Sequence, residues 1–225
     1  RIISNPPKGL FGINIGPNKD TNNRMEDYLI GLRKFYNLAD YLTINISSPN
    51  TENLRSFHNE DELNELLNLI EKEKKILETT VPITLKISPD IEDKNINIIS
   101  DLLLKHGVEA VIISNTTDKN RENLSNINKL EKGGLSGKPL EKRSNELINK
   151  FYKILKNKIK IIGVGGVDSG QSAYQKIISG ASLVQLYTGM IYQGPSIASK
   201  ISEELINILD KERVKNISDV VGSKN

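Results

Sequence analysis

Short apolar runs rich in β-branched residues alternate along this chain with longer stretches in which apolar residues recur every three or four positions. The first pattern is typical of buried parallel strands and the second of amphipathic helices, so their alternation predicts successive βα units. Six strands are predicted, at residues 10–15, 41–46, 83–87, 110–114, 159–164 and 183–187. Helices are predicted near residues 25–38, 60–78, 94–106, 141–157, 170–179 and 196–211.

The predicted helix at residues 60–78 shows the helical period most clearly. Leu63, Leu66, Leu67 and Ile70 form one apolar stripe, and glutamate and lysine fill the positions between them. This is the pattern of a surface helix that packs one face on a core. The stripe is therefore interpreted as core and not as a cofactor site.

Two long polar linkers, residues 47–59 and 116–138, each follow the carboxyl end of a predicted strand. Barrel enzymes of the βα type carry their chemistry at these ends. The predicted fold class is therefore α/β, a TIM (β/α)8 barrel with about six of its eight units in this chain. Residues 1–225 are interpreted as one catalytic barrel domain, and about two further units are expected to precede residue 1.

Composition narrows the chemistry that this domain can use. Of the 225 residues, 37% are hydrophobic and 26% charged, which is typical of a folded globular domain. Without cysteine and with only two histidines, neither disulfides nor a metal site are expected. The net charge of +3 with scattered lysines gives no reason to expect nucleic acid. Apolar runs long enough to span a bilayer are absent from the sequence.

The segment Asn45–Thr51, NISSPNT, is the densest group of polar residues after a predicted strand. Pro49 and Asn50 also suit an ordinary turn, and the segment alone does not decide between the two readings. In the functional reading, Asn45 and Asn50 offer amide donors and acceptors to a planar polar ring, and Ser48 touches a reacting carbon. A serine hydroxyl is a weak base in water, so this role needs a site that excludes solvent.

Two glycine clusters, at residues 133–137 and 163–166, follow the fourth and fifth predicted strands. Either cluster alone could serve only as a tight turn. Glycines also let backbone N–H groups approach an anion, and a helix that starts near Gly170 would direct its amino end toward it. Because barrels commonly bind phosphate after their last strands, the two clusters together favour a phosphate site.

These motifs resemble those of the dihydroorotate dehydrogenases, in the same order along nearly the whole chain. The matching segments are Gly12–Gly16 with Asn18–Asp20, NISSPNT at 45–51, Lys86 with Ser88–Asp90, Ser114–Thr117, Gly133–Gly137, Gly163–Gly166, and Leu186–Tyr187. Each motif is weak alone, but their common order makes chance agreement improbable. The catalytic base of the family is cysteine in the soluble class and serine in the membrane-associated class. Ser48 therefore resembles the quinone-reducing, membrane-associated class.

The resemblance implies a role for each matching residue. Ser48 would remove a proton from C5 of dihydroorotate while hydride leaves C6 for N5 of FMN. The residues implied to hold the substrate are Asn45, Asn50, Asn115 and Thr116. Those implied to face the flavin are Asn14, Asn45, Lys86 and Ser114. The FMN phosphate and ribityl chain would contact Gly137, Gly166, Tyr187 and Thr188.

The same resemblance implies oxidation of dihydroorotate to orotate in pyrimidine synthesis, with a quinone as electron acceptor. It also implies peripheral membrane contact through a segment outside residues 1–225. The membrane would be a bacterial inner membrane at its cytoplasmic face, or the mitochondrial inner membrane in a eukaryote. The family's front flavin loop, substrate-binding lysine and asparagine-rich loop find no match in these 225 residues.

Two alternatives remain open at this point. Another FMN-binding barrel, such as a dihydropyrimidine dehydrogenase domain or a dihydrouridine synthase, would need a catalytic cysteine, which this sequence lacks. The second alternative is a non-catalytic barrel remnant that serves as an interaction surface. Retention of flavin would distinguish an enzyme from such a scaffold.

Overall fold

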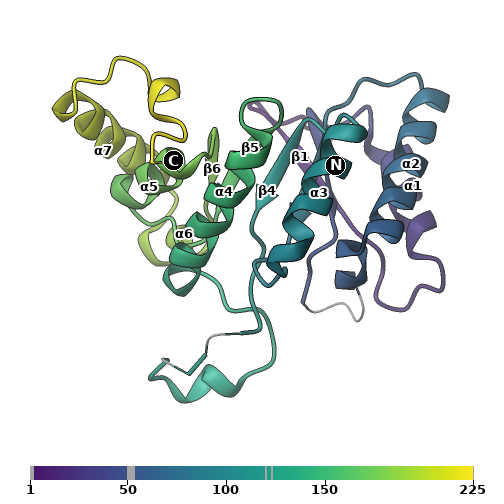
Figure 1. Cartoon of the computed structure of the whole chain (residues 1–225), viewed down its shortest axis with the longest axis horizontal. Coiled ribbons are helices and arrows are strands. Elements are labelled where there is room, and N and C mark those ends of the chain that lie inside the picture. Colours follow the sequence, from purple (N-terminus) through teal and green to yellow (C-terminus); the bar gives the residue numbers. More distant parts are fainter. Residues whose placement is uncertain (1–2, 50–53, 120, 123, 225) are drawn as a thin grey trace.

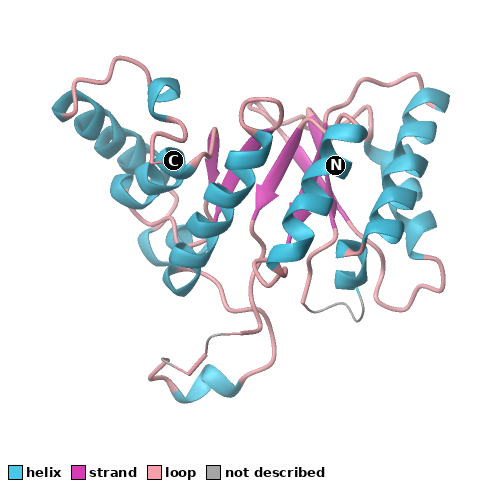
Figure 2. Ribbon diagram, viewed as in Figure 1, coloured by secondary structure: helices cyan, strands magenta, loops and turns pink. Residues whose placement is uncertain are grey.

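The strands of the chain form a single parallel sheet, in which each strand pairs with the next one along the sequence. The computed structural model describes residues 3–49, 54–119, 121–122 and 124–224. The strands are β1 (Gly12–Ile15), β2 (Tyr41–Asn45), β3 (Ile83–Ile87), β4 (Ala110–Ile113), β5 (Lys160–Val164) and β6 (Leu183–Gln185). Every one lies within a predicted range, so the six predicted strands are confirmed (Figure 2).

Most of the helices cover the outer face of this sheet (Figure 1). The helices of the chain are α1 (Arg24–Phe35), α2 (Glu60–Ile76), α3 (Asp93–Lys105), α4 (Glu141–Leu155), α5 (Gly170–Ser179), α6 (Thr188–Gln193) and α7 (Ile197–Lys211). On α2, the apolar stripe that begins at Leu63 and ends at Ile70 is buried in the main core, as the sequence predicts.

The sheet is curled, with β1 and β6 at its two edges. The side chains of Gln185 on β6 and Tyr41 on β2 approach each other within 3.5 Å, although three strands separate them in the sheet order. Such curvature is that of part of a closed barrel. The arrangement therefore agrees with six βα units of an eight-unit barrel.

Alternation along each strand separates an outer core from an inner row. Leu85 and Ile87 of β3 point outward and are fully buried under the helices. Thr43 and Thr84 point inward, where their hydroxyls lie 2.8 Å apart in a buried hydrogen bond. Because Lys86 lies two residues after Thr84 on the same strand, its side chain points to the same inner face, near the carboxyl end of β3.

Several short elements were not predicted, among them η1 (Leu54–His58) and η4 (Ile217–Val220). The chain between β4 and α4 makes an excursion that stands away from the sheet and carries η2 (Ile127–Leu130), at the bottom of Figure 1. An antiparallel bridge between Thr117 and Leu135 closes its base. After the excursion, η3 (Lys138–Leu140) leads into α4. In addition, β6 ends at Gln185, two residues before the predicted end of this strand, and a short helix, α6, begins at Thr188.

Among the described residues, no helix is both long and apolar enough to cross a membrane.

Candidate functional site

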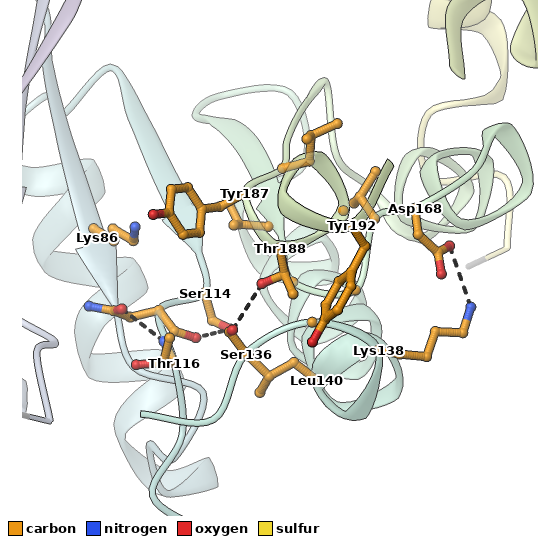
Figure 3. Close-up of a pocket in the computed structure, with 18 residues that line it drawn as sticks. Lys86, Ser114, Thr116, Ser136, Lys138, Leu140, Asp168, Tyr187, Thr188 and Tyr192 are labelled. Atoms are coloured by element: carbon orange, nitrogen blue, oxygen red, sulfur yellow. Dashed lines mark hydrogen bonds and ion pairs between the residues drawn. The ribbon is translucent and has the colours of Figure 1, made fainter. Parts of the chain in front are cut away.

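A pocket of about 340 Å³ lies at the carboxyl ends of β3 to β6, where the two glycine motifs meet the end of β3 and the residues directly after β4 (Figure 3). Its walls come from segments far apart in the sequence. The lining residues include Lys86, Ser114, Asn115, Thr116, Ser136, Gly137, Leu140, Val164, Gly165, Gly166, Tyr187, Thr188 and Tyr192. This is the end of a βα fold at which small-molecule sites are found.

A cluster of hydrogen-bonded side chains joins the ends of β2 and β4. The Asn45 side-chain oxygen accepts from Ser47 Oγ at 2.8 Å and from Asn115 Nδ2 at 3.4 Å. Asn115 Nδ2 also donates to Ser47 Oγ at 3.0 Å, and its own oxygen accepts from the Thr116 N–H at 2.8 Å. Asn45 and Asn115, which follow different strands and were predicted to hold the same substrate, therefore form one unit. Ser47, which the sequence reasoning did not single out, is fully buried between them.

Ser48 is half-buried and directly follows this cluster. The next residue, Pro49, packs near Gly134 of the first glycine motif. A Cβ added to Gly134 would lie 1.9 Å from Thr116 Oγ1 and 3.1 Å from Pro49 Cγ. Glycine is therefore required at position 134, since only its bare backbone lets these segments approach. The approach brings the Ser48 segment against Thr116 at the margin of the pocket.

Lys86 is the inner-row cation of the pocket. Its side chain is half-buried, and burial lowers the pKa of its ammonium group from the ordinary lysine value. In Figure 3 the amine lies beside Tyr187, at the end of the pocket opposite Asp168 and Lys138. A lysine held this way favours an anionic or electron-rich partner, because such a partner offsets the cost of desolvation.

Three glycines with positive φ form the other wall: Gly137 (78°), Gly165 (111°) and Gly166 (77°). A Cβ on Gly166 would lie 2.9 Å from Cα and 3.0 Å from N of Glu141, both backbone atoms. Neither the dihedral angle nor the space admits a side chain there. Beside the glycines, Thr188 Oγ1 donates to Ser136 Oγ at 2.9 Å. This wall therefore presents backbone and hydroxyl groups.

The amino end of α5 does not serve this pocket in the way the sequence suggested. Ser169 and Ser172 form a reciprocal capping box, and the Gly170 N–H donates to Glu204 at 2.5 Å. The first amides of α5 are therefore bound within the protein. The pocket is instead lined by Thr188 and Gly189, in the first turn of α6.

A buried lysine supports the glycine wall from behind. Ser144 of α4 donates to the Val164 carbonyl at 2.6 Å, at the end of β5. Lys176 of α5 in turn donates to Ser144 Oγ and Asn145 Oδ1, each at 3.0 Å. The Lys176 side chain is fully buried, and this burial lowers its pKa to about 7.

The predicted site residues fall into three groups. Those that line the pocket are Lys86, Ser114, Asn115, Thr116, Gly137, Gly166, Tyr187 and Thr188. Asn45 reaches it through Asn115, and Ser48 lies at its margin. Asn14 is exposed on the edge strand β1 and does not line the pocket, while Asn50 lies outside the described residues.

Several lining residues were missed by the sequence reasoning. Ser136 and Gly165 stand inside motifs that were noted as glycine clusters, so their neighbours were a usable signal. Leu140, Asp168 and Tyr192 carry no sequence signal and reach the pocket through the fold alone. Groups of three or more histidine, aspartate or glutamate side chains that could hold a metal ion do not occur in the described part of the chain.

Fold and pocket together define a βα-barrel protein with a small-molecule site at the carboxyl ends of its strands. Residues 4–209 match the family model of dihydroorotate dehydrogenase. The chain therefore belongs to the dihydroorotate dehydrogenase family.

Similar proteins agree with this assignment. The dihydroorotate dehydrogenase (quinone) of Bartonella tribocorum is 43% identical over 216 residues, which cover 94% of this chain and 60% of the relative. The protein of the same name from Nitrosomonas europaea is 47% identical over 200 residues, which cover 86% of this chain and 58% of the relative. The solved structure of the Eimeria tenella enzyme with ferulenol superposes with a TM-score of 0.92 at 36% identity. The match covers 98% of this chain and 63% of that one.

The solved relatives are TIM barrels, so the predicted barrel class is confirmed, with part of the barrel in these 225 residues. The chain spans about 60% of the length of the curated relatives that it matches.

Proposed function

We propose that the complete protein to which this chain belongs is a quinone-reducing dihydroorotate dehydrogenase of pyrimidine synthesis. Membership in the family supports this, as do relatives named for the quinone-dependent reaction. The observation that carries the proposal is the pocket itself. It combines a polar amide cluster, an inner-row lysine and a glycine wall, which are the groups that a pyrimidine, a flavin ring and a phosphate would need.

The residues present fit FMN, the cofactor of the family. The bare backbone at Gly137 and Gly166, with the hydroxyls of Ser136 and Thr188, forms a cradle that a Cβ would fill. These residues would hold the phosphate and ribityl chain. Lys86 and Ser114 would face the ring, where the lysine cation stabilises negative charge. When bound, FMN supplies a two-electron acceptor beside the substrate.

The amide cluster is suited to a substrate with alternating N–H and carbonyl groups. Asn45 and Asn115 each carry both a donor and an acceptor, so the pair can bind such an edge in either sense. Their mutual hydrogen bonds fix both side chains before any ligand arrives, which lowers the entropy cost of binding. Thr116 and, by resemblance, Asn50 would complete the contacts to the ring and its carboxylate.

Ser48 is proposed as the base that removes the C5 proton of dihydroorotate. Its place beside the fixed Asn45–Ser47–Asn115 cluster puts a hydroxyl next to the residues that would hold the ring. As Oγ takes up the C5 proton, its own hydroxyl proton would leave to water, because a serine oxygen that carried both protons would be too strong an acid to persist. Serine at this position, together with the names of the relatives, supports the quinone-dependent class.

Because quinones reside in lipid, the proposal includes peripheral membrane association, through a part of the protein outside these 225 residues. The expected location is the cytoplasmic face of a bacterial inner membrane, or the mitochondrial inner membrane in a eukaryote.

The test uses the full-length protein purified with its flavin. Orotate formation from dihydroorotate is followed with a soluble ubiquinone analogue, fumarate and NAD offered separately. We expect rapid turnover with the quinone analogue alone. A preference for fumarate or NAD would contradict the class assignment, and absence of orotate with all three acceptors would contradict the proposed function.

A further inference from the structure

Arg55 lies outside the pocket, yet it touches loops from three βα units. It stands in η1 (Leu54–His58), at the far end of the linker that begins with Ser47 and Ser48. Its Nη2 lies 3.1 Å from Oδ2 of Asp90, and its Nη1 donates to Oδ1 of Asp118 at 3.0 Å. Asp90 follows β3 and Asp118 follows β4. One guanidinium group therefore joins the loops after β2, β3 and β4.

Asp90 is the buried centre of this arrangement. Its side chain is only 7% exposed, compared with 53% for that of Asp118. Besides its ion pair with Arg55, Asp90 accepts from the hydroxyl of Thr117 at 2.5 Å. Thr117 is adjacent to the pocket residue Thr116, so Asp90 is connected directly to the chain that lines the pocket.

The loop that carries Asp90 is itself held firmly. Arg143 of α4 donates to the carbonyl of Pro89 at 2.9 Å and to the carbonyl of Ile91 at 3.0 Å. Both neighbours of Asp90 are thus bound to the same helix. The Asp90 carboxylate is therefore held in place opposite the Arg55 guanidinium.

The Arg55 guanidinium also affects the titratable groups around it. Burial alone would raise the pKa of Asp118, but hydrogen bonds with Arg55 and Asp90 outweigh it and the pKa is lowered. Burial, and then the positive charge of Arg55, lower the pKa of the neighbouring His58 to about 4. His58 is therefore neutral near pH 7, and within η1 the charge that faces the carboxylates comes from Arg55.

We propose that Arg55 and Asp90 form an ionic clamp that positions the Ser48 segment against the loops after β3 and β4. The linker is tied at its start by Asn45, Ser47 and Asn115, and at its end by this clamp. Arg55 is a positioning residue that acts through Ser48, and in this respect the inference rests on the proposed function. Asn45 and Asn115 stand on strand ends and do not depend on the clamp.

The clamp is tested in the full-length flavoprotein with Arg55→Met. A misplaced base should slow proton removal, so kcat per bound flavin is expected to fall about 10- to 100-fold. KM should stay within about threefold, because the strand-end amides still bind the substrate. Amide hydrogen exchange within residues 46–58 should rise. Arg55→Lys keeps the charge but reaches only one carboxylate, so it should restore part of kcat.

Arg33→Met is the matched control. Arg33 pairs with Glu73, which is 8% exposed, through two 2.8 Å hydrogen bonds between α1 and α2, away from the pocket. The Arg33→Met substitution should lower thermal stability without changing kcat. If Arg55→Met lowers only stability, as Arg33→Met does, the clamp has no positioning role and the proposal is wrong. If the unaltered protein fails to oxidise dihydroorotate, the proposed function is wrong. The clamp is tested independently of activity: if amide hydrogen exchange is unchanged in both Arg55→Met and Arg55→Lys, the clamp is wrong as well.

Discussion

The two sides of the pocket are built from different parts of the polypeptide. At the ends of β2, β3 and β4 the polar groups in or beside the pocket are side chains, namely the amides of Asn45 and Asn115 and the Lys86 amine, with Ser48 at the margin. On the other side they are largely backbone, exposed in conformations with positive φ by Gly165 and Gly166 after β5 and by Gly137 just before η3.

The difference corresponds to the ligand expected on each side. A pyrimidine ring has a particular sequence of donors and acceptors, which only chosen side chains can match. A phosphate is nearly symmetric and is well bound by several N–H groups of any residue, provided the backbone can approach. Substitutions on the side-chain side should therefore alter the rate of substrate oxidation, and substitutions on the glycine side should alter the affinity for the cofactor.

The largest effect is expected for Ser48→Ala in the full-length protein. Removal of a positioned base should lower kcat by about two to four orders of magnitude, while bound flavin stays stoichiometric. Steady-state kinetics and the flavin absorbance of the same sample measure both quantities. Ser56→Ala is the control, since it removes a hydroxyl from the same linker that bonds to Glu62 instead of facing the pocket. Loss of flavin in Ser48→Ala would place this residue in the cofactor site and break the comparison.

On the glycine side, Gly166→Ala should weaken FMN binding about 10- to 100-fold, because strain at such a position is about 1–3 kcal/mol. The new methyl group would also meet the backbone of Glu141. Turnover at saturating FMN should change little. Reconstitution of the apoprotein, followed by flavin fluorescence, gives the affinity.

Gly107→Ala is the matched control for this substitution. Gly107 also has positive φ, at 59°, but a Cβ there would meet no atom within 4 Å. Equal FMN affinity in the two variants would show that the backbone of the glycine wall does not hold the cofactor.

The smallest effect concerns the support of the glycine wall. Lys176 has its pKa lowered to about 7 in the folded protein, so between pH 7 and pH 9 it loses its proton when folded and keeps it when unfolded. Stability must then rise with pH over this range. Relative to Lys176→Met, the free energy of unfolding of the unaltered protein should increase by about 2 kcal/mol from pH 7 to pH 9. Denaturant titrations at both pH values measure it, with the exposed Lys158→Met as control. A pH-independent difference would mean that Lys176 titrates normally.

Most of the fold could be predicted because the hydrophobic period of each element is a local property of the sequence. The strand order followed because consecutive strands of a βα chain pair with one another. Strand β3 was predicted to the residue, and the Leu63–Ile70 stripe of α2 packs as expected. The short helix α6 was missed, since six residues are too few to show a period.

The pocket residues were predictable where a motif of the sequence carries them. Asn115 and Lys86 were predicted from the resemblance to the family, whose motifs they match, and Gly166 also from the glycine cluster after the fifth predicted strand. Leu140 and Tyr192 were not, because they reach the pocket only through packing of η3 and α6. The expectation for the helix near Gly170 was wrong in one respect. Its first amides are bound by Ser169, its neighbour in sequence, and by Glu204 of α7, which only folding brings to it.

The strict chain order of the sheet also sets how costly each strand pairing is to form. Paired residues of β5 and β6, such as Ile162 and Leu183, are 183 − 162 = 21 positions apart, whereas Ala110 of β4 and Lys160 of β5 are 160 − 110 = 50 apart. Closing the longer loop costs about 0.8 kcal/mol more in chain entropy. The seam between β4 and β5 is thus the most entropically demanding pairing in the sheet, and it is the same seam at which the side-chain half of the pocket meets the glycine half.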